Sequence, residues 1–176
     1  MIEPQRRRRL AGQILFVLLF LAILFLRLMP LNPGRVAWPG PDLAICLTMA
    51  WLLRRPEQVP VLMIALMFLL EDFLLLRPLG LWTAIVVMGT EAARNREQRW
   101  RELPFMVEWL RVVILLALMM LGYRLVLAVF FLPLPPLGQV ILQFIATIGA
   151  YPLTAGLLRW PLGLRRSPID TDTRRR

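Results

Sequence analysis

The chain has no histidine, no lysine and a single cysteine, Cys46, among its 176 residues. Zinc sites and nucleophilic catalysis draw on clusters of histidine and cysteine, so the sequence contains neither a zinc site nor a Ser-His or Cys-His system. One cysteine excludes a disulfide within the chain, and its apolar neighbours predict a buried, inert thiol. These absences exclude most of the chemistry of soluble enzymes, and we expect no cofactor.

Apolar residues, by contrast, are abundant. They make up 59% of the chain, and the mean hydropathy is +0.66. An ordinary soluble domain is about 45 to 50% apolar, so this composition indicates a protein of the lipid bilayer. The net charge of +10 comes from arginine alone on the basic side. These arginines lie between apolar runs and at the chain ends, which indicates membrane topology and argues against a nucleic-acid partner.

Six apolar runs predict an all-α integral membrane protein with six transmembrane helices in residues 10–166. Residues 1–9 form a basic N-terminus, and residues 167–176 form a polar tail that we expect to be disordered. The runs are residues 10–26, 43–53, 59–76, 79–90, 107–132 and 137–158. A straight span needs about 20 residues, so the second and fourth runs must borrow flanking residues or lie buried against their neighbours.

The arginines orient this bundle. If the N-terminus lies inside, the outer side receives only Arg27, Arg35 and Arg77, and the other loops and both ends carry the remaining clusters. The positive-inside rule therefore predicts that both termini are cytoplasmic. Tryptophans near the predicted helix ends are typical of an aromatic belt at the membrane surface. They are Trp38, Trp51, Trp82, Trp109 and Trp160.

Two adjacent carboxylates, Glu71 and Asp72, lie in the middle of the third apolar run. Charges inside a span are rare and usually have a partner. Arg124 lies about 20 Å along its helix and Asp72 about 18 Å along the third, which predicts an ion pair between Arg124 and one of the acids. Neighbouring residues point about 100° apart, so the second acid is protonated or meets Arg77, water or a partner subunit.

The favoured interpretation of this pair is a structural contact that sets the register of the helices; a surface for a partner or ligand is the alternative. A proton relay is less favoured because the other spans carry few polar groups. Gly149, Pro152 and Gly156 fall on one face of the last helix, where another backbone can approach closely. We expect internal packing there, with a partner helix as the alternative.

Several ordered pieces of sequence resemble the rod shape-determining MreD family. They are Met29-Pro30 at the end of the first helix, Pro41 before a helix that carries Trp51, Asp72 followed eight residues later by Leu79-Gly80, and Tyr151-Pro152 before a basic end. Length and hydropathy profile agree as well. The chain departs from the family pattern at Phe68, where a small residue is common, and it adds Glu71.

This resemblance implies a non-enzymatic scaffold or adaptor in the bacterial inner membrane, within the machinery that elongates the cell wall. The expected partners are MreC, MreB, RodA and a penicillin-binding transpeptidase, together with membrane lipids. Self-association as a homodimer stays open. The resemblance also implies a fold similar to the six-helix substrate-binding component of energy-coupling-factor transporters, with Asp72 and Gly80 among the site residues.

Two other classes compete with the scaffold. A substrate-binding subunit of a small-molecule (vitamin-type) transporter has much the same hydropathy, but a ligand pocket needs convergent polar groups and the outer loops supply few. A membrane enzyme such as a lipid phosphotransferase needs clustered carboxylates for a metal, and Glu71 with Asp72 alone are too few. We therefore expect a membrane scaffold without catalytic residues.

Overall fold

The computed structural model describes residues 3–29, 40–95 and 105–159. Within these ranges the chain forms six α-helices and one short 3-10 helix, with no β-strand. The elements are α1 (Glu3–Leu28), α2 (Leu43–Leu52), η1 (Pro56–Gln58), α3 (Val61–Leu74), α4 (Leu81–Asn95), α6 (Phe105–Val129) and α7 (Leu137–Arg159). The prediction of an all-helical fold is confirmed.

Three of these helices are long and apolar enough to cross a membrane. The segments are Arg6–Leu28, Phe105–Val129 and Leu137–Leu158, within α1, α6 and α7. The other three helices, α2, α3 and α4, have 10, 14 and 15 residues. They are shorter than the roughly 20 residues that a straight span requires. Length and composition therefore support three of the six predicted spans.

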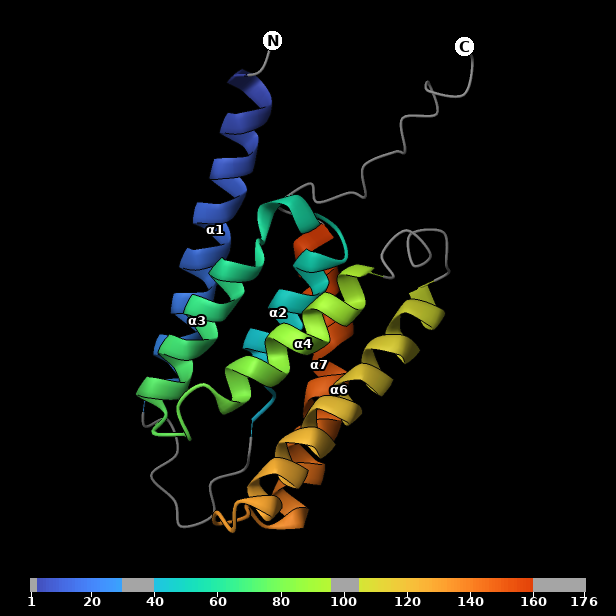
Figure 1. Cartoon of the computed structure of the whole chain (residues 1–176). Helices are drawn as coiled ribbons and strands as arrows, with labels where there is room; N and C mark the ends of the chain where they lie inside the picture. The colour runs from blue at the N-terminus through green and yellow to red at the C-terminus, as the bar shows by residue number, and fades with distance from the viewer. Residues whose placement is uncertain (1–2, 30–39, 96–104, 160–176) are drawn as a thin grey trace.

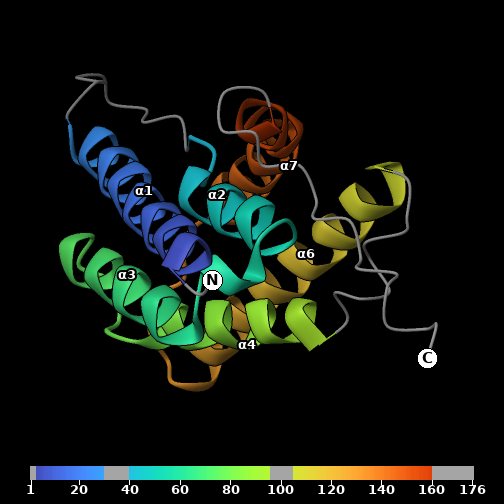
Figure 2. The same ribbon diagram turned by 90° about the horizontal axis from the view of Figure 1, so that it is seen from above.

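The short helix α2 lies at the centre of the bundle, with α1, α4, α6 and α7 around it (Figures 1 and 2). Nine of its ten residues are buried. It packs most extensively on α7, while α3 packs on α4. The short second run therefore lies buried against neighbouring helices. This is one of the two alternatives that its length predicts.

Aromatic side chains form the core between α1, α2 and α3. Phe16 meets the edge of the Trp51 ring at a centroid distance of 5.7 Å, and Phe20 meets Phe68 at 5.1 Å. All four side chains are fully buried. Edge-to-face pairs of this kind stabilise a core by about 0.5–1.5 kcal/mol beyond the area they bury. A large residue at Phe68 therefore fits because α1 supplies an aromatic partner.

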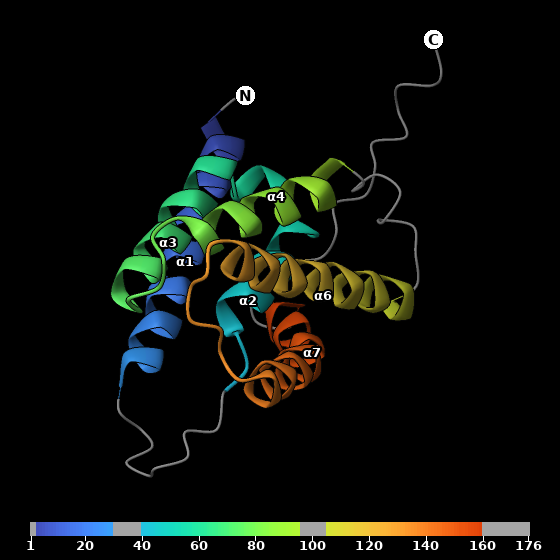
Figure 3. The same ribbon diagram turned by 60° about the horizontal axis from the view of Figure 1, so that its bottom comes forward.

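Helices α3 and α6 end in the same way, at the end of the bundle shown in Figure 3. Each closes with two backbone hydrogen bonds of the Schellman type. The wider of the two runs from the N–H of Arg77 to the carbonyl of Asp72 in α3, and from the N–H of Leu132 to the carbonyl of Leu127 in α6. The residue inside each closure, Leu76 or Phe131, has a φ of 53°. Glycine usually fills this left-handed position, so both connections carry local backbone strain.

Some expectations change in the structure. The basic residues 6–9 belong to the first turns of α1, so the helix begins earlier than predicted, and residues 160–176 lie outside the described ranges together with the predicted tail. Trp51 and Trp82 are buried inside the bundle and do not form an aromatic belt. Trp38 and Trp160 also lie outside the described residues. The burial of Cys46 is confirmed.

Candidate functional site

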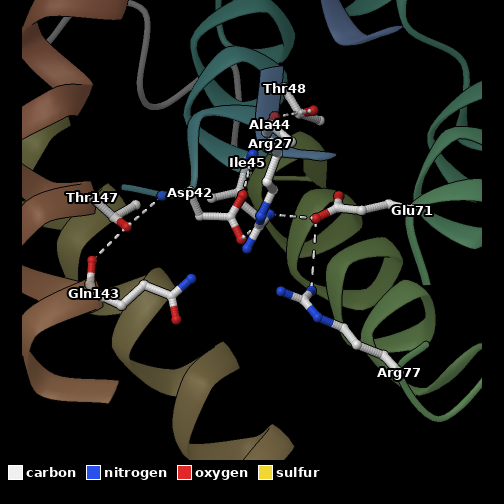
Figure 4. Close-up of polar contacts among 9 residues, drawn as sticks. All are labelled: Arg27, Asp42, Ala44, Ile45, Thr48, Glu71, Arg77, Gln143 and Thr147. Atoms are coloured by element: carbon white, nitrogen blue, oxygen red, sulfur yellow. Dashed lines mark hydrogen bonds and ion pairs between the residues drawn. The ribbon is translucent and has the colours of Figure 1, made fainter. Parts of the chain in front are cut away.

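A network of four charged side chains lies at the end of the bundle where α1 and α3 finish (Figure 4). Arg27 Nη1 donates to Glu71 Oε1 at 2.6 Å and lies 3.4 Å from Asp42 Oδ2. Arg77 Nη1 lies 3.7 Å from the same Glu71 oxygen. Both carboxylates are buried, while the two arginines keep about a quarter of their side-chain surface exposed. The two positive charges thus balance two buried negative charges.

Asp42 connects this network to two further helices. Its Oδ1 accepts a hydrogen bond from the backbone N–H of Ile45, which caps the first turn of α2. Its own backbone N–H donates to Thr147 Oγ1 on α7 at 3.0 Å, and that hydroxyl donates to the carbonyl of Gln143. One chain of contacts therefore joins α1, α2, α3 and α7.

The direction of the helices explains why these residues meet. Arg27 lies in the last turn of α1, Asp42 immediately precedes α2, and Glu71 lies near the end of α3. Because α1 and α3 run in one direction and α2 runs in the other, all three positions reach the same end of the bundle (Figure 1). Removing one partner of a buried ion pair costs about 3–5 kcal/mol, so the network holds these helices in one register.

Asp72 has a different role from its neighbour Glu71. Its Oδ2 accepts hydrogen bonds from the backbone N–H and the hydroxyl of Thr83, at 3.1 and 2.9 Å. These bonds cap the first turn of α4. Gly80, which starts that turn, has a φ of 80°, a conformation that glycine adopts without steric cost. Asp72 and Gly80 thus form the connection between α3 and α4.

The predicted ion pair of Arg124 with Asp72 or Glu71 is wrong. Arg124 Nη1 donates to the carbonyl of Pro135 at 2.8 Å, and no carboxylate of the described chain lies within ion-pair distance. Depth along a helix does not determine which helices are neighbours. Helix α6 packs against α4 and α7, whereas α3 packs against α4 and α1. Among the alternatives for the second acid, the structure shows the contact with Arg77, which Glu71 makes.

The face of α7 formed by Gly149, Pro152 and Gly156 is not packed against the rest of the described bundle. Both glycines are exposed, and no atom lies where a methyl group on either one would sit. Pro152 is partly exposed. The expectation of internal packing at this face is therefore wrong. The side of α7 that faces the bundle instead carries Thr147, Tyr151 and Ala155.

Sequence reasoning missed three of the residues that organise the bundle. Arg27 stands out in the sequence only as one of the few arginines of the outer side, and Asp42 is not singled out, although an Asp directly before an apolar run is a recognised capping signal. The third is Glu108 on α6, whose Oε1 accepts a hydrogen bond from the Tyr151 hydroxyl at 3.0 Å. Both residues of that pair are buried, and an acid in the first turn of an apolar helix was the available signal.

The charged groups of the site neutralise one another. Within the described ranges, no group of three or more histidine, cysteine, aspartate or glutamate side chains could hold a metal ion. Glu71, Asp42 and Asp72 each face an arginine or backbone and hydroxyl donors from another element. The arrangement therefore stabilises the contact between helices.

No family model, no curated protein and no solved structure matches this chain. The class of protein rests on the described structure itself. It is an all-helical bundle in which three helices have the length and composition of membrane spans. The charged network and its contact with Thr147 tie two of these long helices, α1 and α7, to the short helices α2 and α3 at one end.

Proposed function

We propose that this protein is a non-enzymatic scaffold of the bacterial inner membrane that belongs to the cell-elongation machinery, as its resemblance to the MreD family implies. All six helices lie in the membrane in this proposal, in an arrangement like the substrate-binding component of energy-coupling-factor transporters. Both chain ends are cytoplasmic. MreC is the direct partner, and MreB, RodA and the penicillin-binding transpeptidase belong to the same assembly.

The open face of α7 is the observation that carries this proposal. A scaffold needs a surface that its own fold leaves uncovered, and no atom of the described residues lies where a methyl group on Gly149 or Gly156 would sit. Small residues on an apolar helix allow a second helix to pack closely in a membrane. The charged groups support the same conclusion, because Glu71 and Asp42 are occupied by arginines of this chain.

The alternating direction of the helices supports the proposed topology. The first turn of α1 and the last turn of α7 point to the same end of the bundle (Figure 1). Arg54 and Arg55 follow the end of α2, and Arg94 lies in the last turn of α4, at that same end. Reporter proteins fused before residue 3 and after residue 176 test this directly. Both fusions should report the cytoplasm, and a periplasmic reporter at either end would contradict the six-span arrangement.

Photo-crosslinking in native membranes tests the partner. A photo-reactive amino acid at Gly156 should yield an adduct with MreC, since this position is exposed on the proposed face. The matched control is the neighbouring position Ala155, which is 1% exposed and faces the bundle. Equal adducts from both positions, or an adduct of Gly156 with lipid alone, would count against this contact.

Cell shape tests the function. Depletion of the protein in its rod-shaped host should produce wide, rounded cells, and expression of the intact chain should restore the rod. The Gly156→Trp variant should fail to restore the rod while reaching normal abundance in the membrane, because it blocks close approach and disturbs no internal contact. Unchanged cell width after depletion would refute the proposal.

A second candidate is the substrate-binding subunit of a small-molecule transporter, and a pocket of about 740 Å³ between α4, α6 and α7 favours it. Polar side chains reach this pocket from the helices, although the outer loops supply few, as expected. Uptake assays with a labelled vitamin mixture separate this candidate from the scaffold. Only a transporter subunit makes uptake depend on the pocket residues.

A further inference from the structure

The pocket of about 740 Å³ lies at the same end of the bundle as the charged network, beside the residues that carry it. Its walls come from α4, α6 and α7 and from the connections that follow α3 and α6. Ligand sites in proteins commonly measure 300–1,000 Å³, so the pocket is large enough for a small molecule or a lipid headgroup.

Two residues of the pocket lining, Trp82 and Arg124, carry polar groups that the described residues do not fully satisfy. Trp82 is 96% buried, and its Nε1–H finds no acceptor among the described residues. Arg124 uses one nitrogen on the Pro135 carbonyl and forms no ion pair within the part of the chain that the structure describes. An unpaired buried donor and an arginine without a counter-ion are both costly in an apolar surrounding. A ligand that accepts hydrogen bonds would satisfy both.

The charges around the pocket favour an anion. Asp42 reaches the pocket wall, but its carboxylate lies beside Arg27 and its backbone is bonded to Thr147. Arg77 also lines the pocket, with its guanidinium 5.8 Å from the centre of the Trp82 ring. Arg124 is the remaining charged group of the lining, and its charge is not balanced by a described acid. Two of the three charged side chains in the lining are therefore arginines, and the one acid among them is occupied by Arg27 within the bundle.

The apolar part of the lining indicates the rest of the ligand. Leu76, Leu132 and Leu134 form part of the wall and are exposed to the outside, Leu76 at 93%. Leu76 occupies the left-handed backbone position that ends α3. Tyr123 packs edge-on against Trp82 at 5.5 Å and closes the inner side. A headgroup bound in this pocket would lie next to exposed leucines, as it would at a membrane surface.

We propose that this pocket binds an anionic amphiphile, with a phosphate or carboxylate headgroup on Arg124 and Trp82 Nε1–H and an apolar chain against the exposed leucines. Arg77 adds a second positive charge near the headgroup. This inference goes beyond the scaffold function and requires neither MreC binding nor transport. A membrane scaffold with such a site would respond to the anionic lipid or phosphate ester that reaches it.

Binding to the purified full-length protein in a neutral detergent tests this proposal. Native mass spectrometry should show phosphatidylglycerol bound about tenfold or more tightly than phosphatidylcholine, because the choline cation of the second lipid offsets the negative charge of its phosphate and is repelled by Arg77 and Arg124. Glycerol phosphate, which lacks acyl chains, distinguishes a lipid site from a site for soluble phosphate esters. Its binding at the same site would assign the soluble source, and its failure to bind would assign the lipid.

Three variants locate the site. Arg124→Gln should weaken phosphatidylglycerol binding about tenfold, and Trp82→Phe should weaken it several-fold while keeping the ring contact with Tyr123. The matched control is Arg111→Gln, which removes the same charge from the same helix outside the pocket and should leave binding unchanged. Circular dichroism of each variant checks the fold.

Three results would overturn the proposal. One is equal affinity for the two lipids in the absence of glycerol phosphate binding. Another is full binding by both Arg124→Gln and Trp82→Phe. The third is an equal loss with Arg111→Gln, which would show a general attraction between arginines and anions.

Discussion

Arg27 Nη1 donates a hydrogen bond to Glu71 Oε1 at 2.6 Å, across 44 positions of sequence. The pair joins the last turn of α1 to Glu71, one of the two adjacent acids inside the third apolar run. Asp42 on one side and Arg77 on the other extend it into a balanced group of four charges. Each charge in the group is acceptable in an apolar bundle only because the others are present.

A double-mutant cycle measures this pair. Arg27→Gln and Glu71→Gln should each destabilise the protein by about 2–4 kcal/mol, because each leaves a charge of the network uncompensated. The double variant should lose less than the sum, by a coupling of about 1–3 kcal/mol. Chemical unfolding in detergent, followed by tryptophan fluorescence, gives these values.

The control for this cycle is the pair Arg55 and Glu57, whose atoms lie 3.7 Å apart and whose side chains are 29% and 45% exposed. Its neutral variants should change stability by less than about 0.5 kcal/mol, and their coupling should be small. Additive losses at Arg27 and Glu71 would show that the two side chains act independently.

Asp72 should behave as a helix cap. Asp72→Ala removes the acceptor of both Thr83 hydrogen bonds and should cost about 1–2 kcal/mol. Asp72→Asn keeps one side-chain oxygen in place and should cost less than half as much. The same unfolding measurement compares the two variants. A larger loss of stability for Asp72→Asn than for Asp72→Ala would indicate that the position requires the negative charge and not the cap.

The left-handed residues that end α3 and α6 give a prediction of opposite sign. Leu76→Gly and Phe131→Gly should each stabilise the protein by about 1 kcal/mol, because glycine removes the strain of a positive φ. Little packing is lost, since the two side chains are 93% and 96% exposed. Gly80→Ala is the matched reversal: its φ is 80° and the space around it is open, so a loss of about 1 kcal/mol is expected from the backbone alone.

Thermal unfolding of the three variants measures both the predicted gain and the predicted loss of stability. If Leu76→Gly is destabilising while Gly80→Ala behaves as expected, the exposed leucine has a contact that the isolated chain does not show. Weaker binding of phosphatidylglycerol by Leu76→Gly would then identify that contact as the apolar part of the proposed lipid site.

Gly12 marks the close approach of α1 to η1. A methyl group there would overlap the side-chain amide of Gln58, whose Oε1 accepts a hydrogen bond from Trp51 Nε1 at 3.0 Å. Gly12→Ala should therefore destabilise the protein by about 1–3 kcal/mol, because an overpacked site and a broken buried hydrogen bond add to each other. The change should also alter the fluorescence of Trp51.

Gly156→Ala provides the comparison, since no atom lies near its position. In the isolated protein it should stabilise α7 by about 0.5–1 kcal/mol through helix propensity alone. Equal effects of the two alanines on stability would mean that α1 and η1 do not approach as closely as the structure shows.

Much of the fold could be predicted from the sequence, because composition and runs of apolar residues act locally. The all-helical class, the burial of Cys46 and the unusual position of Glu71 and Asp72 follow from residue types and their spacing along the chain, while Gly80 is named through the family resemblance. Proline, glycine and arginine also marked where most helices end. These are signals that a segment carries by itself, whatever it packs against.

The choice of partners required the tertiary structure. Depth along a helix suggested Arg124 for the buried acids, but depth does not say which helices are neighbours, and Glu71 instead meets Arg27 and Arg77. The same lack of direction around the helix axis hid the open face of α7 and the buried position of Trp82. Sequence alone determined that this chain forms apolar helices with a few expensive charges, and packing decided which charges meet, because contact depends on the rotation and adjacency of helices that lie far apart in the chain.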